Sequence, residues 1–302
     1  MDWLFFALIP PFLFALSNRL DKYLLEGFFK GQTGALILFS CFISLLTLPI
    51  IYLIQPSVLS IPLFYAGVMI LVGFLYVIYL FPYFWALKLD EASKVVPIFQ
   101  AVPLFGVIMG FFILGDTLSI NQIFAGALII AAAFGLSANI GVKKIIFKRK
   151  VLFFVLSASF LVALSYVLLK LVAISTDFFT ALFWEQAGYL ILGLVLLTKK
   201  SYRTQFAQVF KINSGKIIGL NIFNELINIL AHFIFAYASL LVPVGLVWIV
   251  NGSVPFFILS LGIIITIFFP WLGKEDISRK ALLQKAFFIG LMIIGAAILS
   301  LS

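Results

Sequence analysis

The chain has 302 residues, of which 64% are hydrophobic and 10% are charged, with a formal net charge of +9 and a mean hydropathy of +1.24. A soluble globular domain carries about 25% charged residues and cannot hide this much apolar surface in one core. The composition therefore excludes the soluble enzyme folds and predicts a polytopic membrane protein.

Apolar segments follow one another along the chain, and each is long enough to span a bilayer, which takes about 20 mainly apolar residues. We predict helices over residues 3–20, 34–54, 62–88, 92–114, 118–139, 151–174, 177–198, 215–238, 242–269 and 281–301. Turns are predicted at 55–57, 115–117, 175–177 and 241–243, and longer polar loops at 140–150, 199–214 and 273–280. The fold class is therefore an all-α membrane protein with ten transmembrane helices.

Basic residues lie almost entirely in every second loop. Nineteen of the 20 Lys and Arg side chains fall in the loops that follow spans 1, 3, 5, 7 and 9, and only Lys170 falls on the other side. Loops rich in Lys and Arg stay in the cytoplasm. Both termini are therefore predicted to be external, in what we expect to be a bacterial inner membrane.

The two halves of the chain share short identities and carry opposite loop charges. Ala15-Leu16-Ser17 matches Ala163-Leu164-Ser165, and Val102-Pro103 matches Val254-Pro255. The loop after span 2 has no basic residue, whereas its equivalent after span 7 has five. An inverted repeat requires such opposite bias. We predict five-helix repeats at 1–142 and 151–302, joined by a basic cytoplasmic linker at 143–150.

The end of the first half carries a recognisable pattern. It consists of Ala86-Leu87-Lys88, Val96-Pro97, Pro103, Leu114-Gly115-Asp116-Thr117-Leu118, Gln122 and Gly126. This pattern resembles the end of an EamA-type domain of the drug/metabolite transporter superfamily, although the family usually has Glu where Asp116 stands. The resemblance implies a ten-helix secondary transporter with a central cavity formed by helices 1, 3, 4, 6, 8 and 9.

One polar stripe marks the eighth predicted span. At 100° per residue, Asn221, Asn224, Glu225, Asn228 and His232 share one face, which must turn away from lipid. We predict that Asn221, Glu225 and Asn228 bind substrate, and that Glu225 and His232 carry the coupling proton. The alternative is that the stripe only holds helices together by hydrogen bonds.

A carboxylate flanked by aromatic residues lies in the seventh predicted span. Glu185 follows Trp184 and precedes Tyr189 by about one turn. Such a grouping suits an organic cation through charge and cation–π contacts, so Trp184 and Glu185 are predicted to bind substrate. An ion pair between Glu185 and Lys170 is the alternative.

Two amides lie near prolines in the fourth and ninth predicted spans. Gln100 follows Pro97, and Asn251 precedes Pro255. Proline frees a backbone carbonyl and lets a helix bend, so both amides are predicted to bind substrate where helices rock. Kinks without ligand contact are the alternative.

Charged residues cluster at the predicted cytoplasmic end of the first span. Arg19 and Asp21 are close enough in sequence to form an inner gate that breaks during alternating access. A charge cluster that only anchors the helix at the interface is the alternative.

Several function classes lack the residues that they need. Cys41 and His232 are the only residues of their kinds, so no Cys/His metal set can be written, and no nucleotide-binding Gly-x-x-x-x-Gly-Lys-Ser/Thr loop occurs. We therefore expect no enzymatic activity, no cofactor and no metal. The basic residues lie in short loops, which argues against nucleic acid and favours membrane lipid as their partner.

The leading hypothesis is a secondary transporter of a small organic metabolite, cationic or zwitterionic, driven by a proton gradient or by exchange. An importer of anionic or phosphorylated metabolites is one alternative, and a membrane scaffold or receptor that transports nothing is another. Oligomeric state is left open, because two fused halves can complete a cavity without a dimer.

Overall fold

A computed structural model describes residues 2–29, 32–89, 95, 98–137, 148–212, 214–268 and 279–301. Within these ranges the elements are helices and no strand occurs, as the sequence predicts. Most of the predicted linker, the second half's acidic pair at 275–276 and Pro97 lie outside the described residues.

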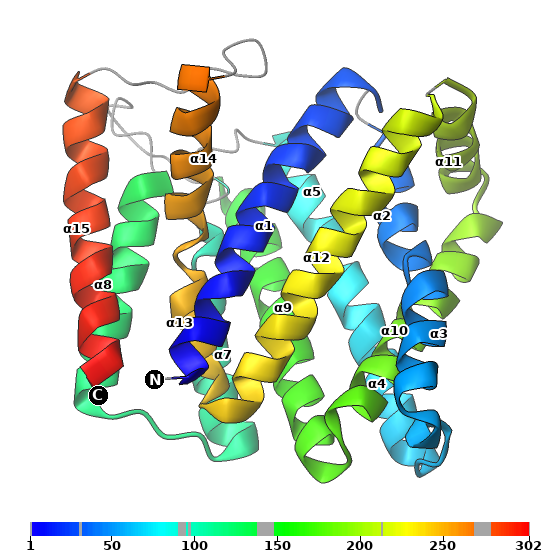
Figure 1. The fold of residues 1–302 in the computed structure, drawn as a ribbon, viewed down its shortest axis with the longest axis horizontal. Helices are drawn as coiled ribbons and strands as arrows, with labels where there is room; N and C mark the ends of the chain where they lie inside the picture. The colour runs from blue at the N-terminus through cyan, green and yellow to red at the C-terminus, as the bar shows by residue number, and fades with distance from the viewer. Residues whose placement is uncertain are drawn as a thin grey trace.

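The first half of the chain forms the elements that Figure 1 colours from blue to green. They are α1 (Asp2–Gly27), α2 (Thr33–Phe42), α3 (Ser44–Ile54), the 3-10 helix η1 (Pro56–Leu59), α4 (Leu63–Ile78), α5 (Leu80–Leu89), α7 (Val102–Met109), the π-helical turn η2 (Gly110–Leu114) and α8 (Ile120–Ser137).

The second half begins inside the predicted linker, because α9 already starts at Arg149. Its elements are α9 (Arg149–Ser175), α10 (Phe178–Thr198), α11 (Lys200–Ile212), α12 (Gly215–Leu241), α13 (Val244–Asn251), α14 (Val254–Phe268) and α15 (Arg279–Leu301).

Seven helical segments of the described chain are long and apolar enough to cross a membrane. They are Trp3–Leu24, Thr33–Ile54, Leu63–Ala86, Arg149–Ser175, Phe178–Thr198, Gly215–Leu241 and Val244–Phe268. Three shorter apolar helices, Val102–Leu114, Ile120–Leu136 and Lys285–Leu299, coincide with predicted spans 4, 5 and 10. A multi-pass membrane protein is therefore confirmed, and the number of ten crossings stays a prediction.

The predicted turns are confirmed. Asp177 caps α10 by accepting a hydrogen bond from the Thr180 amide (2.9 Å), and α12 ends at Leu241 before α13 begins. Gly115 ends η2 in the left-handed region, with φ of 71°, a conformation that glycine adopts without a Cβ penalty. These positions thus end one helix and start the next.

The predicted loop at 199–214 is wrong, because it folds as helix α11. Tyr202, Phe206, Val209 and Phe210 recur at helical spacing, and Val209 is buried. The Phe206 ring contacts that of Phe39 in α2, with ring centroids 5.0 Å apart. The charge of this segment concealed its amphipathic pattern.

The two halves interlock rather than lie apart. In Figure 1, α1 runs beside α12 and α8 runs beside α15, and α4 packs against α9 and α10. Gly73 of α4 and Gly188 of α10 allow these two helices to approach closely. A Cβ on Gly188 would lie 2.5 Å from the Ile70 carbonyl oxygen. Small residues let helix backbones approach closely where lipid supplies no hydrophobic driving force.

Both termini lie at one end of the bundle, and α11 lies at the opposite end (Figure 1). Basic residues gather at the α11 end, where Lys148 donates a hydrogen bond to the Leu89 carbonyl (2.7 Å). The helix arrangement therefore agrees with the separation of termini and basic loops that the sequence predicts.

Candidate functional site

The polar stripe of α12 is buried along most of its length. Asn221, Asn224, Glu225 and His232 are at most 5% exposed, whereas Asn228 is only half-buried. Its two ends face different neighbours: the first end contacts α1 and α2, and His232 contacts α9 and α10. The stripe therefore builds two sites.

The first site, here called the carboxylate site, consists of Asp21, Ser40, Asn221, Asn224 and Glu225. The Asn224 side-chain amide donates to Asp21 Oδ1 (2.6 Å), and the Ser40 hydroxyl donates to Glu225 Oε1 (3.0 Å). Asn224 and Glu225 are adjacent on α12, so two carboxyl groups from α1 and α12 lie close to one polar face. A cation or a proton suits such a place.

Several buried atoms of the carboxylate site have no hydrogen-bond partner. Both amide atoms of Asn221 are unpaired, as is the Asn224 side-chain oxygen, and the nearby Ser17 hydroxyl is unpaired as well. An unsatisfied buried polar group costs about 1–3 kcal/mol. Several such atoms together are therefore unfavourable for stability. A polar ligand or water that hydrogen-bonded to them would remove this cost.

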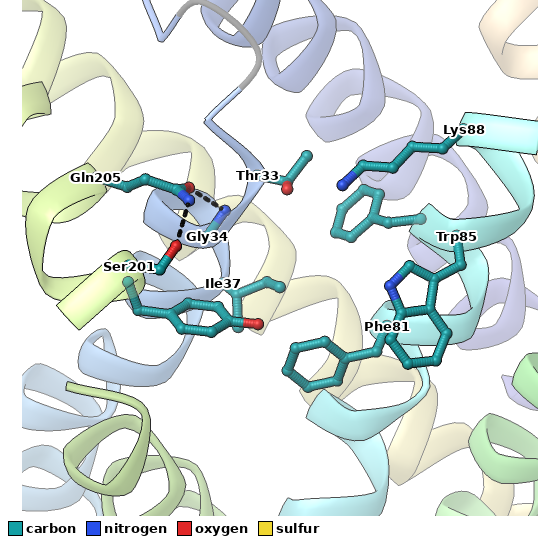
Figure 2. Close-up of a pocket in the computed structure, with 10 residues that line it drawn as sticks. Thr33, Gly34, Ile37, Phe81, Trp85, Lys88, Ser201 and Gln205 are labelled. Atoms are coloured by element: carbon teal, nitrogen blue, oxygen red, sulfur yellow. Dashed lines mark hydrogen bonds between the residues drawn. The ribbon is translucent and has the colours of Figure 1, made fainter. Parts of the chain in front are cut away.

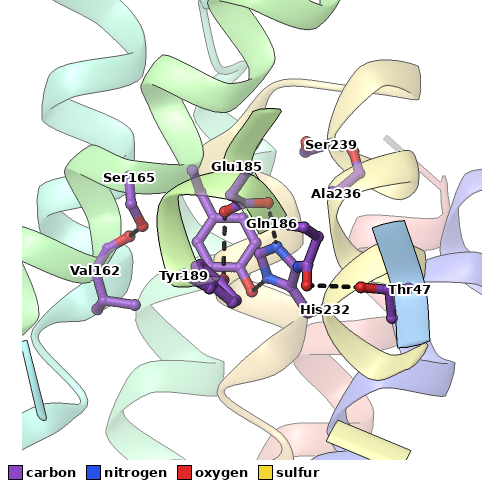
Figure 3. A network of polar contacts seen from close by, with 10 residues as sticks. Thr47, Val162, Ser165, Glu185, Gln186, Tyr189, His232, Ala236 and Ser239 are labelled. Atoms are coloured by element: carbon purple, nitrogen blue, oxygen red, sulfur yellow. Dashed lines mark hydrogen bonds and ion pairs between the residues drawn. The ribbon is translucent and has the colours of Figure 1, made fainter. Parts of the chain in front are cut away.

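The second site, here called the histidine site, consists of Tyr76, Tyr166, Glu185, Tyr189 and His232. The Tyr166 hydroxyl lies 2.6 Å from His232 Nδ1, and His232 Nε2 lies 2.8 Å from Glu185 Oε2. Tyr189 donates to the other carboxylate oxygen (3.4 Å), and Figure 3 shows Glu185, Tyr189 and His232 converging. If Tyr166 donates to Nδ1, then Nε2 carries the hydrogen that Glu185 accepts, and each polar atom has a partner.

Aromatic rings enclose the histidine site. Tyr76 of α4 stacks on Tyr189, with ring centroids 5.5 Å apart, and its ring lies 4.7 Å from that of His232. Beside it, the Thr47 hydroxyl donates to the Gln186 side-chain oxygen (3.0 Å), as Figure 3 shows. Glu185 is 0% exposed, so this site is closed in the structure.

The alternative ion pair between Glu185 and Lys170 is wrong. Lys170 pairs with Asp116 (3.2 Å) and also donates to the Val242 carbonyl (2.9 Å). Asp116 in turn accepts a hydrogen bond from the Val244 amide (2.9 Å). The acidic residue of the EamA-like pattern thus ties the first half of the chain to the second.

Trp184 does not join the aromatic cluster around Glu185. Its indole N–H donates to the Val58 carbonyl of η1 (2.8 Å). Successive helix residues point about 100° apart, so Trp184 turns away from the face that Glu185 and Tyr189 share. The predicted flanking is correct for Tyr189 and wrong for Trp184.

Asn251 and Gln100 lie at helix breaks, as their nearby prolines predict. Asn251 ends α13, with two residues between it and the start of α14, and its buried side-chain oxygen is unpaired. Gln100 is half-buried and precedes α7. Helices α7 and α13 pack closely, because a Cβ on Gly245 would lie 2.6 Å from Val107. The two amides therefore lie on neighbouring interrupted spans.

Arg19 and Asp21 reach different helices. Arg19 donates to the Ile258 carbonyl of α14 (2.8 Å), and Asp21 accepts from Asn224 of α12. The predicted gate pair thus connects α1 to both spans of the second half that pack against it.

Sequence reasoning missed Ser40, Tyr76 and Tyr166 as site residues. Tyr76, Tyr79 and Tyr83 recur at helical spacing in one span. This pattern could have identified Tyr76 as a candidate site residue. Ser40 and Tyr166 are isolated in sequence, and only the helix packing shows their partners.

Apolar spanning helices that bury carboxylates, amides and a histidine define a polytopic membrane protein with an internal polar region. Residues 1–138 match the model of the EamA-like transporter family, so the resemblance of the first half of the chain to an EamA-type domain is confirmed. A solved structure titled "Crystal structure of protein" is 16% identical, with a TM-score of 0.62 over 100% of this chain and 96% of that chain, and it shows a shared fold. The curated proteins gave no match.

Proposed function

We propose that this protein is a secondary transporter that moves a small organic metabolite, cationic or zwitterionic, by alternating access. The observation that carries the proposal is the carboxylate site, where unpaired amides and two carboxyl groups lie buried among spanning helices. Secondary transporters bind their substrates near the bilayer midplane, between their repeats. This site combines α1 and α2 of the first half with α12 of the second.

The polar groups of the site suit a ligand with a positive charge. Asp21 and Glu225 would attract a cationic group, and Asn221 and Asn228 would offer amide donors and acceptors to the rest of the ligand. Asn251 and Gln100 would also contact the ligand, and they would move with the interrupted spans on which they lie. An anionic substrate is less favoured, because Asp116 already neutralises Lys170.

Proton coupling is assigned to Glu225 and His232, with Glu185 acting through its pair with His232. A buried carboxyl group and an imidazole can exchange a proton without leaving the bundle. Arg19 and Asp21 would form the inner gate, since they link α1 to α14 and α12.

The order of the elements supports two inverted five-helix halves. Among the described residues, five apolar helical segments precede the linker and five follow it, and α11 is an addition to the second half. Ten crossings place both ends of the chain on one side, which the basic loops assign to the exterior. No catalytic chemistry is required of any residue in this proposal, and a scaffold that transports nothing remains the competing class.

A binding screen tests the proposal. Purified protein is heated with amino acids, polyamines, nucleosides or drugs, because a ligand of the folded state raises the melting temperature. A true substrate should stabilise the wild type and the Asn121→Leu variant, whose exposed change lies at the start of α8, but not Asn221→Leu. Equal stabilisation of all three proteins, followed by normal uptake into vesicles, would place the binding site elsewhere.

A further inference from the structure

A hollow separate from both polar sites lies beneath the amphipathic helix α11. Its volume is about 200 Å³, and it is bounded by α2, α5 and α11. Figure 2 shows Lys88 and Trp85 on one side, Thr33 at the rim, and Ser201 and Gln205 on the other. We refer to it as the α11 hollow.

Helix α11 has the features of a helix that lies at the level of the lipid headgroups. It connects the end of spanning helix α10 to the start of spanning helix α12, and its 13 residues are too few to cross the bilayer. Its apolar side packs on α2 through Phe206, and Lys200, Arg203 and Lys211 are exposed. A basic amphipathic helix of this kind lies in the interface plane.

The lining of the hollow suits an anion. Lys88 supplies a positive charge, and none of the described lining residues is acidic. In the described part of the chain Lys88 forms no ion pair. Burial raises the pKa of the Tyr202 phenol, so this lining residue keeps its proton and adds no negative charge.

The polar wall of the hollow is held in place by hydrogen bonds. The Gln205 side-chain oxygen accepts from the Gly34 amide (3.0 Å), and its nitrogen donates to the Ser201 hydroxyl oxygen (3.3 Å), as Figure 2 shows. Ser201 therefore acts as an acceptor toward Gln205 and keeps its own O–H free to donate. Thr33 offers a second hydroxyl on the facing helix.

We propose that the α11 hollow binds the phosphate headgroup of an anionic phospholipid. Lys88 would pair with the phosphate, and the hydroxyls of Ser201 and Thr33 would donate to its oxygens. The hollow is smaller than the roughly 300–1,000 Å³ of sites that enclose a whole ligand, so the acyl chains must lie outside. Trp85, which is 51% exposed beside Lys88, has the place of an interfacial aromatic residue next to such chains.

This binding has a structural consequence. Helix α11 belongs to the second half of the chain, whereas α2 and α5 belong to the first. A headgroup held between them would join the two halves at the predicted cytoplasmic surface. The inference is independent of the proposed transport activity, since it concerns lipid binding to the folded protein.

The test measures melting temperature and bound lipid in detergent, with phosphatidylglycerol, phosphatidylcholine or inorganic phosphate added. Phosphatidylglycerol should bind and stabilise the wild type, and Lys88→Gln should weaken its binding by about tenfold, the worth of one charge-assisted contact. Lys211→Gln removes a charge from the exposed surface of α11 and should leave binding unchanged. Ser201→Phe should also reduce binding, because it fills the hollow without altering the charge.

Three results would overturn the inference. Equal effects of phosphatidylglycerol and phosphatidylcholine would show that no anion is selected. Equal losses in Lys88→Gln and Lys211→Gln would indicate diffuse surface attraction. Stabilisation by inorganic phosphate as large as that by phosphatidylglycerol would make the ligand a soluble phosphate and not a lipid.

Discussion

Helix α12 carries two polar sites that differ in how completely their hydrogen-bonding groups are satisfied. In the histidine site, both ring nitrogens of His232 and both carboxylate oxygens of Glu185 have partners. In the carboxylate site, the Asn221 amide and the Asn224 oxygen have none. Buried polar groups in folded proteins are nearly always paired, so the unpaired atoms mark a place that the folded chain does not complete.

The two sites are also close enough to influence one another. Glu225 and His232 are seven residues apart on one helix, which corresponds to about 10 Å along its axis. The histidine site, whose polar atoms are hydrogen-bonded, can fix the positions of the helices. The carboxylate site, which has unpaired polar atoms, can receive a ligand. The following changes test that division of tasks.

The largest effect is expected where α4 meets α10 beside the histidine site. In Gly73→Leu the new side chain would collide with the backbone at Glu185 and Gly188. Overpacking a closed interface costs about 1–3 kcal/mol and more where backbone must move, so we expect a severe loss of folded protein in detergent, measured by size-exclusion chromatography. Gly67→Leu on the same helix meets open space and should behave as the wild type. Normal yield of Gly73→Leu would contradict the closeness of this crossing.

Removal of the imidazole should have the next largest effect. His232→Leu leaves the buried Glu185 carboxyl group without its main partner, and breaking a buried pair costs about 3–5 kcal/mol. The melting temperature should fall strongly, less so in His232→Gln, which keeps a polar side chain. The neighbouring Phe233→Leu serves as the control for a change of volume. An unchanged melting temperature in His232→Leu would mean that the site does not stabilise the fold.

Loss of charge at the two carboxylates should affect different properties, ligand binding at Glu225 and stability at Glu185. Glu225→Gln should lower equilibrium binding of a cationic substrate by about tenfold or more, as expected for a charge-assisted contact. If Glu225 instead carries the proton, gradient-driven uptake is lost while exchange persists. Glu185→Gln should lower the melting temperature and leave binding largely intact. Binding and flux are measured on the same vesicle preparations, and a loss of binding in Glu185→Gln alone would reverse the assignment of the two sites.

Much of this architecture could be predicted from residue patterns, since span positions, turns and the buried stripe follow from apolar length and helical spacing. The partners of the stripe could not be predicted. Lys170 was the partner considered for Glu185, and only the packing of α9, α10 and α12 shows that His232 is the partner instead. Helix α11 was missed because its charged residues concealed four apolar ones at helical spacing.

The smallest expected effects come from removing one hydroxyl beside each site. Thr47→Val preserves the shape of the side chain but removes the hydrogen-bond donor to the Gln186 side-chain oxygen. The Gln186 side-chain nitrogen is already unpaired, so the free energy of unfolding should fall by about 1–3 kcal/mol. Ser40→Ala removes a donor to Glu225 and should cost about 0.5–1.5 kcal/mol, mostly in ligand binding.

This pair of variants separates the two sites most finely, because each removes a single hydroxyl group from the same spanning segment, α2 with α3. Thr47→Val should shift the melting temperature and keep the wild-type affinity. Ser40→Ala should keep the melting temperature, since Glu225 can recover a partner from water, and it should weaken binding severalfold, since the carboxylate site loses a donor. If both variants lose stability equally and neither changes affinity, the unpaired amides of α12 belong to packing, and the carboxylate site is not where the substrate binds.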